Sequence, residues 1–250
     1  MISVISPAKL MNFTDTSPNN VSSQITESKE MTKTLQVLKK LSTKNIMKSM
    51  KVSEKIAELN YDRFQNFETL PEKQAIYAYN GDVYNNIDTE TLDKNSLRFS
   101  QEHLRILSAL YGLLKPLDMI RAYRLEMSIK MPKLAPKGMN LFWQKNITNH
   151  INSELKTHKN KFLINIASNE YSASIDSKIL DATLINTHFR ETRDGKLKNI
   201  ALNSKRARGM LADYIIRNQL DHPDDIKTFN KSDYKFNKTI SDSNNFYFTK

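Results

Sequence analysis

Charged and phenolic side chains gather in four short stretches of this chain, where strands or turns are predicted to end. The stretches are residues 6–9 (SPAK), 80–84 (NGDVY), 123–126 (YRLE) and 165–171 (NIASNEY). Three of them follow predicted strands, and open α/β sheets bind ligands in the loops at the carboxyl ends of their strands. If these loops converge, they bring together Lys9, Asp82, Arg124, Glu126, Glu170 and Tyr171.

Carboxylates held beside cations are typical of two different situations. Asp82, Glu126 and Glu170 could work as general acids or bases, or hold a hard cation, with Lys9 as a fourth catalytic candidate. Structural ion pairs buried near a sheet give the same sequence pattern. Residue types alone leave both interpretations open.

A fifth stretch, residues 205–209 (KRARG), is strongly basic. Ser204 is a plausible N-cap, so Lys205, Arg206 and Arg208 are predicted to open a helix, where they oppose the helix dipole. A bound anion would account for this arrangement, and a solvated charge run is the alternative. Residues 190–208 hold seven Lys or Arg against two acids.

Residues 104–128 (LRILSALYGLLKPLDMIRAYRLEMS) are apolar on nearly every side at first, which favours a buried helix. Gly112 permits a turn, and Pro116 suits the first turn of a second helix. This outline predicts a helix–hairpin–helix that would position a phosphate with Gly112, Lys115, Arg121 and Arg124.

Composition excludes several kinds of site. There is no cysteine, so thiolate metal sites and disulfides are excluded, and the five glycines form neither a dinucleotide-binding motif nor a P-loop. No G-x-S-x-G or H-E-x-x-H motif is present. We therefore expect no cofactor and assign no metal ligands, since a histidine site would need residues that only the fold brings together.

The chain carries a net charge of +11, which favours polyanionic partners such as nucleic acid, or else reflects a lysine-rich surface. No run approaches the roughly 18 apolar residues that span a bilayer, and the first residues do not resemble a secretory signal. These features predict a cytoplasmic protein that does not enter membranes.

Predicted strands and helices alternate along the chain. Strands are predicted at 1–6, 75–79, 162–167, 182–189 and 197–202, with an edge hairpin in the aromatic tail around 241–245; helices are predicted around 31–38, 44–50, 54–59, 143–155 and from 204 onward. The interleaved order predicts one α/β (α+β) domain over residues 1–250, with a mixed sheet flanked by helices and a helix–hairpin–helix-like element.

Six motifs occur in order from end to end: ISPAK (5–9), GDVY (81–84), LYGLLKPLD (110–118), YRLEM (123–127), NIASNEY (165–171) and KRARG (205–209). In this the chain resembles the YaaA family, also called DUF328 or UPF0246. The resemblance implies a cytoplasmic peroxide-stress protein that keeps intracellular iron low and binds DNA in a positively charged cleft. It implies no settled reaction. Two positions depart from the family pattern: Asn80 stands where Lys is frequent, and Ser128 where Gly is frequent.

Three hypotheses follow. The first is a DNA-binding protein of the peroxide response that contacts mainly phosphates, with little sequence specificity and no protein partner that the sequence identifies. The second is an enzyme acting on a nucleic acid or nucleotide, with Lys9, Arg124, Lys205 and Arg206 holding phosphate. The third, direct iron storage, is disfavoured because the chain has no ferritin-type Glu-x-x-His motif.

Overall fold

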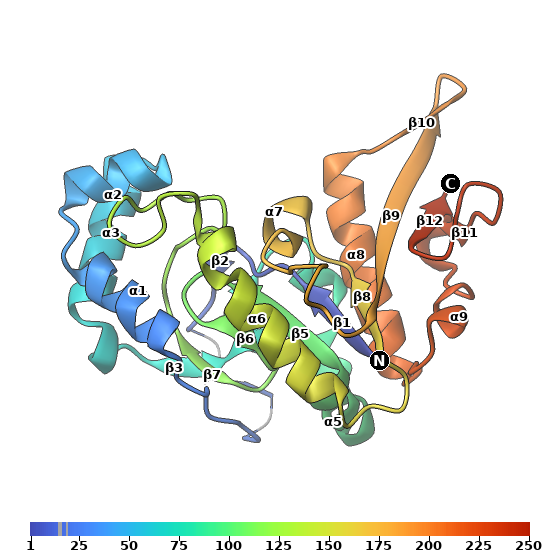
Figure 1. The fold of residues 1–250 in the computed structure, drawn as a ribbon, viewed down its shortest axis with the longest axis horizontal. Helices are drawn as coiled ribbons and strands as arrows, with labels where there is room; N and C mark the ends of the chain where they lie inside the picture. Colours follow the sequence, from blue (N-terminus) through green and yellow to red (C-terminus); the bar gives the residue numbers. More distant parts are fainter. Residues whose placement is uncertain (15–16, 19) are drawn as a thin grey trace.

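A mixed β-sheet runs through the middle of the computed structural model, which describes residues 1–14, 17, 18 and 20–250 (Figure 1). Its strands follow the order β11-β12-β9-β8-β1-β5-β6, and β10 pairs with β9 off this path. The strands are β1 (Ile2–Ile5), β5 (Leu104–Ser108), β6 (Gly112–Leu114), β8 (Phe162–Asn165), β9 (Thr183–Arg193), β10 (Lys196–Lys198), β11 (Lys235–Phe236) and β12 (Asn245–Thr249). The predicted mixed α/β architecture is confirmed.

β1 is the central strand, and all four of its residues are buried. It pairs in parallel with β5 on one side and β8 on the other. Parallel strands covered on both faces are continuous apolar runs, which is the pattern of the predicted strand at 162–167; the strand at 1–6 is predicted from alternation instead. The turn at Asp194 and Gly195 joins β9 to β10, and β11 with β12 forms the predicted edge pair.

The stretch from 104 to 114 is a β-hairpin, so the predicted helix and the helix–hairpin–helix are wrong. β5 and β6 pair antiparallel, and β7 (Met119–Arg121) takes the place of the second helix. An apolar run is equally compatible with a strand buried on both faces. The hydroxyl of Ser108 accepts hydrogen bonds from the backbone N–H groups of Leu110 and Tyr111, which fixes the turn.

Two short sheets lie beside the main one. β2 (Leu10–Met11) pairs with β4 (Tyr79–Asn80), and β3 (Glu72–Gln74) pairs with β7. The strand predicted at 75–79 is mostly wrong, because residues 75–78 form the short helix α4 (Ala75–Ala78). Its first N–H groups donate to the carbonyl oxygens of Asp118 and Pro116, so the chain turns here without leaving backbone donors unpaired.

Helices cover both faces and one flank of the main sheet. They are α1 (Lys29–Lys39), α2 (Thr43–Met50), α3 (Glu54–Gln65), α5 (Lys94–His103), α6 (Met139–Leu155), α7 (Asn169–Ser172), α8 (Ala201–Arg217) and α9 (Pro223–Ile226), with 3-10 turns at Phe67–Thr69, Tyr84–Asn86, Thr89–Thr91 and Lys231–Asp233. In Figure 1, α1–α3 form a group at one side, while α6 crosses β5 and β6 and α8 lies along β9. The predicted helices at 31–38, 44–50, 54–59 and 143–155 are confirmed, and Ser42 caps α2.

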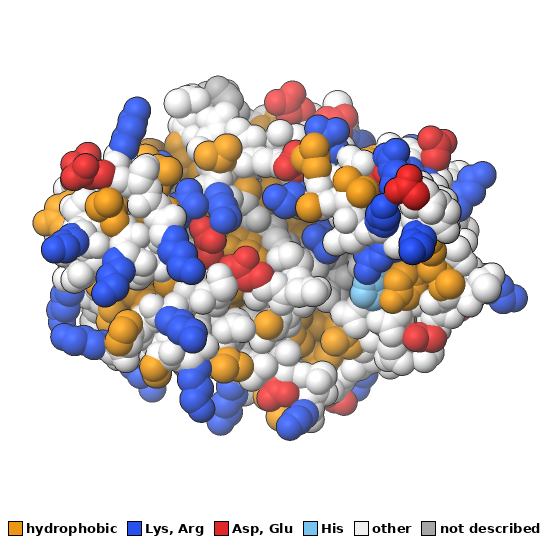
Figure 2. All heavy atoms as spheres, turned by 90° about the horizontal axis from the view of Figure 1, so that it is seen from above, with side chains coloured by type: hydrophobic (Ala, Val, Ile, Leu, Met, Phe, Trp, Pro, Cys, Tyr) orange, Lys and Arg blue, Asp and Glu red, His pale blue; other side chains and the backbone are white. Residues whose placement is uncertain are grey.

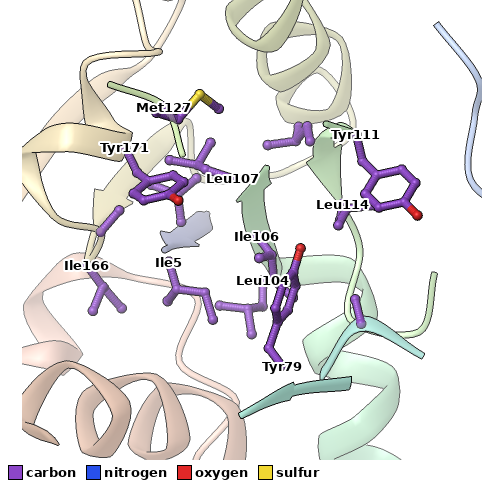
Figure 3. Close-up of a cluster of buried hydrophobic side chains, with 14 of the residues drawn as sticks. Ile5, Tyr79, Leu104, Ile106, Leu107, Tyr111, Leu114, Met127, Ile166 and Tyr171 are labelled. Atoms are coloured by element: carbon purple, nitrogen blue, oxygen red, sulfur yellow. The ribbon is translucent and has the colours of Figure 1, made fainter. Parts of the chain in front are cut away.

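The core packs against both faces of β1 and β5. Figure 3 shows Ile106 on the side of Tyr79 and Leu107 on the side of Met127, as the alternation of a strand requires. All four side chains are buried. Within the described residues, no helix has the length and apolar character needed to cross a membrane.

Candidate functional site

Glu126 lies between two cations from different motifs. Its carboxylate is 2.9 Å from Lys9 Nζ and 3.2 Å from an Arg124 terminal nitrogen. Lys9 follows β1 and is 58% exposed, whereas the Glu126 side chain is only 15% exposed. The first and third of the predicted stretches therefore meet, with one carboxylate serving two positive charges.

Glu170 joins the fourth stretch to the same region. Its Oε1 accepts hydrogen bonds from the backbone N–H of Ser128 at 3.1 Å and from the Ser128 hydroxyl at 2.8 Å. The Ser6 hydroxyl accepts a hydrogen bond from the backbone N–H of Ser168 at 2.9 Å, which ties the loops after β1 and β8 together. The hydroxyl of Ser128 thus gives Glu170 a partner beyond the backbone N–H of the same residue.

The loop carrying Asp82 packs against the loop after β1. The Tyr84 hydroxyl donates to the carbonyl oxygen of Ser6 at 3.0 Å. A Cβ placed on Gly81 would lie 3.4 Å from that of Ala8, an ordinary contact distance. The backbone of Gly209 in α8 lies against Val83 on the opposite side of this loop. All five predicted stretches therefore converge.

The basic stretch lies inside α8 and does not open it. The helix begins at Ala201, so Lys205, Arg206 and Arg208 occupy its second and third turns. Ser204 is buried and bonds to the side chain of Asn199, so it is not the N-cap. The expectation of an anion at the helix start is thus wrong, and any anion here would be held by side chains.

Arg206 and Arg208 have different surroundings. Arg206 Nε is 4.0 Å from the Asp82 carboxylate, and both groups are partly exposed. Arg208 is half-buried, and its Nε makes no hydrogen bond to any residue in the described part of the chain. Burial lowers the pKa of Arg208, and the positive charge of Arg190 lowers it further.

Arg190 and His188 extend the positive region onto β9. Burial lowers the pKa of His188, and the charges of Arg190 and Arg208 add to this effect, while Asn245 and Asp242 oppose it. The Arg190 guanidinium lies 5.8 Å from the centre of the Tyr247 ring. Sequence reasoning counted Arg190 in the basic region and missed His188, whose place on a strand gave no signal.

We call this group of converging charged residues the motif site. Its members are Lys9, Asp82, Arg124, Glu126, Glu170, His188, Arg190, Arg206 and Arg208. Figure 2 shows the molecule from above, with Lys and Arg side chains gathered around the middle of this face and acidic groups among them. Arg124 repeats the feature seen at Arg208, because its buried Nε has no hydrogen-bond partner among the described residues.

Tyrosine side chains underlie the motif site. Burial raises the pKa of Tyr171, and the carboxylates of Glu170 and Glu126 raise it further. Burial also raises the pKa of Tyr123 to about 12, so its hydroxyl stays protonated at neutral pH. Tyr123 therefore acts as a neutral hydrogen-bonding group, with its hydroxyl in contact with those of Tyr79 and Ser108.

The other predicted nucleic-acid-binding residues have different surroundings. Lys115 lies 3.7 Å from Glu154, and Arg121 lies 2.9 Å from Glu72. A Cβ on Gly112 would be 2.5 Å from the Trp143 ring, and its φ of +81° is one that glycine adopts easily. Lys205 is exposed on α8. The phosphate contact proposed for Gly112, Lys115 and Arg121 depended on the helix–hairpin–helix, which the structure replaces with strands.

Oxygen and nitrogen donors for a cation occur in two places. Asp82, Glu126 and Glu170 bring carboxylates to the motif site, but cations or hydrogen-bond donors already contact each of them. A second group lies elsewhere and was missed from the sequence: His103, His158 and Asp221, which are separated by 55 and 63 positions along the chain.

Comparison with known proteins gives full-length matches. The family model described as peroxide stress protein YaaA matches residues 1–240. A UPF0246 protein of Rickettsia bellii (strain OSU 85-389) is 42% identical over 250 residues, covering all of both chains. UPF0246 proteins of Francisella philomiragia and Rickettsia africae are 41% identical over 255 residues and 42% over 253, again covering both chains fully.

Proposed function

Because the chain belongs to the family of the peroxide stress protein YaaA, we propose that it acts in the peroxide response by binding the phosphate backbone of DNA at the motif site. The observation that carries this proposal is the state of two motif arginines. Arg124 and Arg208 each have a buried Nε without a hydrogen-bond partner in the described residues. A buried charged donor left unpaired is costly, and a rotation of the side chain that brings the Nε to the surface would let a phosphate oxygen satisfy it.

The charges around Arg208 support an anionic ligand. Besides burial, the charge of Arg190 lowers the pKa of Arg208. The charges of Arg190 and Arg208 likewise add to burial in lowering the pKa of His188. Like charges held together destabilise a protein unless an anion binds between them. The net charge of +11 would add a favourable long-range field for a polyanion.

Phosphate contacts carry no sequence information, so binding should be salt-dependent and weakly sequence-specific. We would measure fluorescence anisotropy of labelled duplex and single-stranded DNA over a series of salt concentrations. Replacing Arg206 and Arg208 together by Ala should reduce the slope of log affinity against log salt by about 2. The exposed Lys44 and Lys55, replaced by Ala, provide a control with the same loss of charge.

An unchanged slope in the Arg206 and Arg208 variant would remove these residues from the contact surface. An equal reduction in the control variant would show that net charge, and not the motif site, governs binding. In this proposal the protein binds DNA in the cytoplasm and helps to keep intracellular iron low. Both effects would limit oxidative damage to DNA during peroxide stress. Cells carrying the double arginine variant should then accumulate more DNA lesions and more chelatable iron after peroxide exposure than cells carrying the lysine control.

A second candidate function is an enzyme acting on nucleic acid or a nucleotide. The position of Glu126 favours it, because a mostly buried carboxylate between Lys9 and Arg124 lies beside the proposed phosphate position. Glu126 or Glu170 could act as a general base or hold a hard cation. Product analysis on damaged and undamaged DNA, comparing the wild type with Glu170→Gln, tests this. Absence of any product with several divalent metals would count against an enzyme.

A further inference from the structure

A second polar cluster lies at the opposite edge of the main sheet from the motif site. His103 ends α5 just before β5, His158 lies in the loop before β8, and Asp221 lies between α8 and α9. They surround Met1, which precedes β1. Since β1, β5 and β8 are parallel, their amino ends lie at one end of the sheet, and the loops after β1 and β8 that carry Lys9 and Glu170 leave from the other.

The three side chains are close enough to share one ion. One ligand atom from each lies within 4.8 Å of the others, and His103 Nδ1 is 3.5 Å from Asp221 Oδ1. The two imidazole rings meet edge to face with centroids 4.8 Å apart. In a tetrahedral metal site the ligand atoms lie nearer to one another than the 4.8 Å limit found here. Side-chain rotations would bring them together.

Neighbouring groups contact these side chains and fix their orientation, as is usual around residues that bind metals. The His103 ring stacks on Phe99 with centroids 3.9 Å apart, and its Nδ1, now 2.7 Å from the carbonyl oxygen of Met1, gives up that contact when an ion binds. The Asn160 amide donates to Asp221 Oδ2 at 3.3 Å. A hydrogen bond of this kind to a carboxylate fixes the orientation of a ligating residue.

A positive group already occupies the centre of the cluster. The amino group of Met1 lies 2.6 Å from Asp221 Oδ1 and 3.1 Å from His158 Nδ1. The cluster therefore already holds a cation at the position between the Asp221 carboxylate and the His158 ring.

We propose that His103, His158 and Asp221 form a binding site for a divalent first-row transition-metal ion. A donor set of two imidazoles and one carboxylate binds transition-metal ions in preference to alkaline-earth ions. The ion takes the position that the Met1 ammonium holds between Asp221 and His158, and the amino group moves aside. This site is independent of the proposed DNA binding.

The test uses the full chain beginning at Met1 without a tag, freed of metal by a chelator. Zn²⁺ and Co²⁺ are titrated in competition with a chromophoric chelator, and thermal unfolding is followed with and without each ion. We expect one equivalent to bind with micromolar or tighter affinity, a higher melting temperature, and a Co²⁺ spectrum of low-symmetry coordination. His158→Ala should weaken binding at least a hundredfold, and His150→Ala, on the exposed face of α6, should leave it unchanged.

Asp221→Asn preserves the shape of the side chain and guards against a His158 variant that does not fold. It should weaken Co²⁺ binding at least tenfold while circular dichroism shows a folded protein. Failure of the wild type to bind one equivalent overturns the proposal. Equal losses in the His150→Ala control, or none in His158→Ala and Asp221→Asn, also overturn it. Duplex DNA binding measured on the same variants should not change, so failure here is distinguishable from failure of the proposed function.

Discussion

Gly209 in α8 approaches the carbonyl oxygen of Val83 so closely that a Cβ at position 209 would lie 2.1 Å from that oxygen. The same Cβ would be 2.8 Å from the Cβ of Asn86. No real side chain tolerates these distances, so only glycine lets the helix pack on this loop. The contact joins two of the ordered motifs and sets the distance between Asp82 and Arg206 across the motif site.

Gly209→Ala should therefore destabilise the protein although it replaces glycine inside a helix. Helix propensity alone would stabilise the variant by about 1 kcal/mol. Overpacking against backbone costs about 1–3 kcal/mol, and α8 cannot move away without displacing its arginines. Because the clash is with backbone, the cost lies at the upper end of that range, and we expect a net loss of about 2 kcal/mol in urea unfolding, together with weaker DNA binding.

Gly195→Ala is the matched control for this prediction. Gly195 has φ +70° in the turn between β9 and β10, with no atom within 4 Å of an added Cβ. Gly195→Ala should lower the free energy of unfolding by only about 1 kcal/mol, the cost of placing alanine in a left-handed backbone conformation, and should leave DNA binding unchanged. A Gly209→Ala protein as stable as the wild type would mean that the close packing of α8 is not required.

Glu126→Gln should strengthen DNA binding if the motif site holds phosphate. The substitution removes the negative charge that Lys9 and Arg124 share and frees both cations for a ligand. We expect affinity at low salt to rise about fivefold, corresponding to about 1 kcal/mol. Glu58→Gln changes net charge equally at an exposed position of α3. Weaker DNA binding by Glu126→Gln would show that this carboxylate itself takes part in ligand binding or in catalysis.

Acid stability should depend on Glu191 in β9. The side chain is 3% exposed, and Asn203, Tyr234 and Arg193 donate to it at 2.6, 2.9 and 2.8 Å. Burial by itself raises its pKa, but these donors outweigh burial and hold the pKa at about 2. A carboxyl whose pKa is lower in the folded state stabilises the fold above its ordinary pKa of about 4.5. That contribution is lost as pH falls from about 4.5 towards about 2.

Glu191→Gln should lower the free energy of unfolding at pH 7 by about 2 kcal/mol, because it replaces hydrogen bonds to a charged group with neutral ones. The variant should also lose less stability than the wild type on acidification, and urea unfolding from pH 7 to pH 2.5 would show this as a flatter curve. Parallel curves for the two proteins would show that Glu191 titrates alike in the folded and unfolded states.

The sequence predicts an element correctly where its hydrophobic pattern is compatible with only one kind of secondary structure. The run at 162–167 is short, apolar and bounded by polar residues, and it forms β8. The run at 104–114 has the same uniform apolarity over a greater length, which favours a helix; only the turn held by Ser108 divides it into two strands. Local pattern carries no information about which buried element a doubly covered segment becomes.

The convergence of the motif loops follows from one rule about sheets, and for that reason it could be anticipated. Lys9 and Glu170 lie near each other because their loops follow the parallel neighbours β1 and β8. Glu126 follows β7 of a separate sheet and joins them through its ion pair with Lys9. The cluster of His103 and His158 could not be anticipated, since no spacing marks two histidines that meet only through strand order. His188 was missed for the same reason, because a lone histidine on a strand indicates no neighbour.

Tyr123→Phe should destabilise the core beneath the motif site by about 2–3 kcal/mol. The buried Tyr123 hydroxyl is 2.8 Å from that of Tyr79 and 2.7 Å from that of Ser108, so its removal leaves two buried hydroxyl groups each short of one partner. Tyr214→Phe is the control, because its hydroxyl meets Thr228 at the surface and water can replace it. Chemical unfolding should show a loss below about 1 kcal/mol for that control. Equal losses in the two variants would mean that the buried network contributes no more than an exposed hydrogen bond.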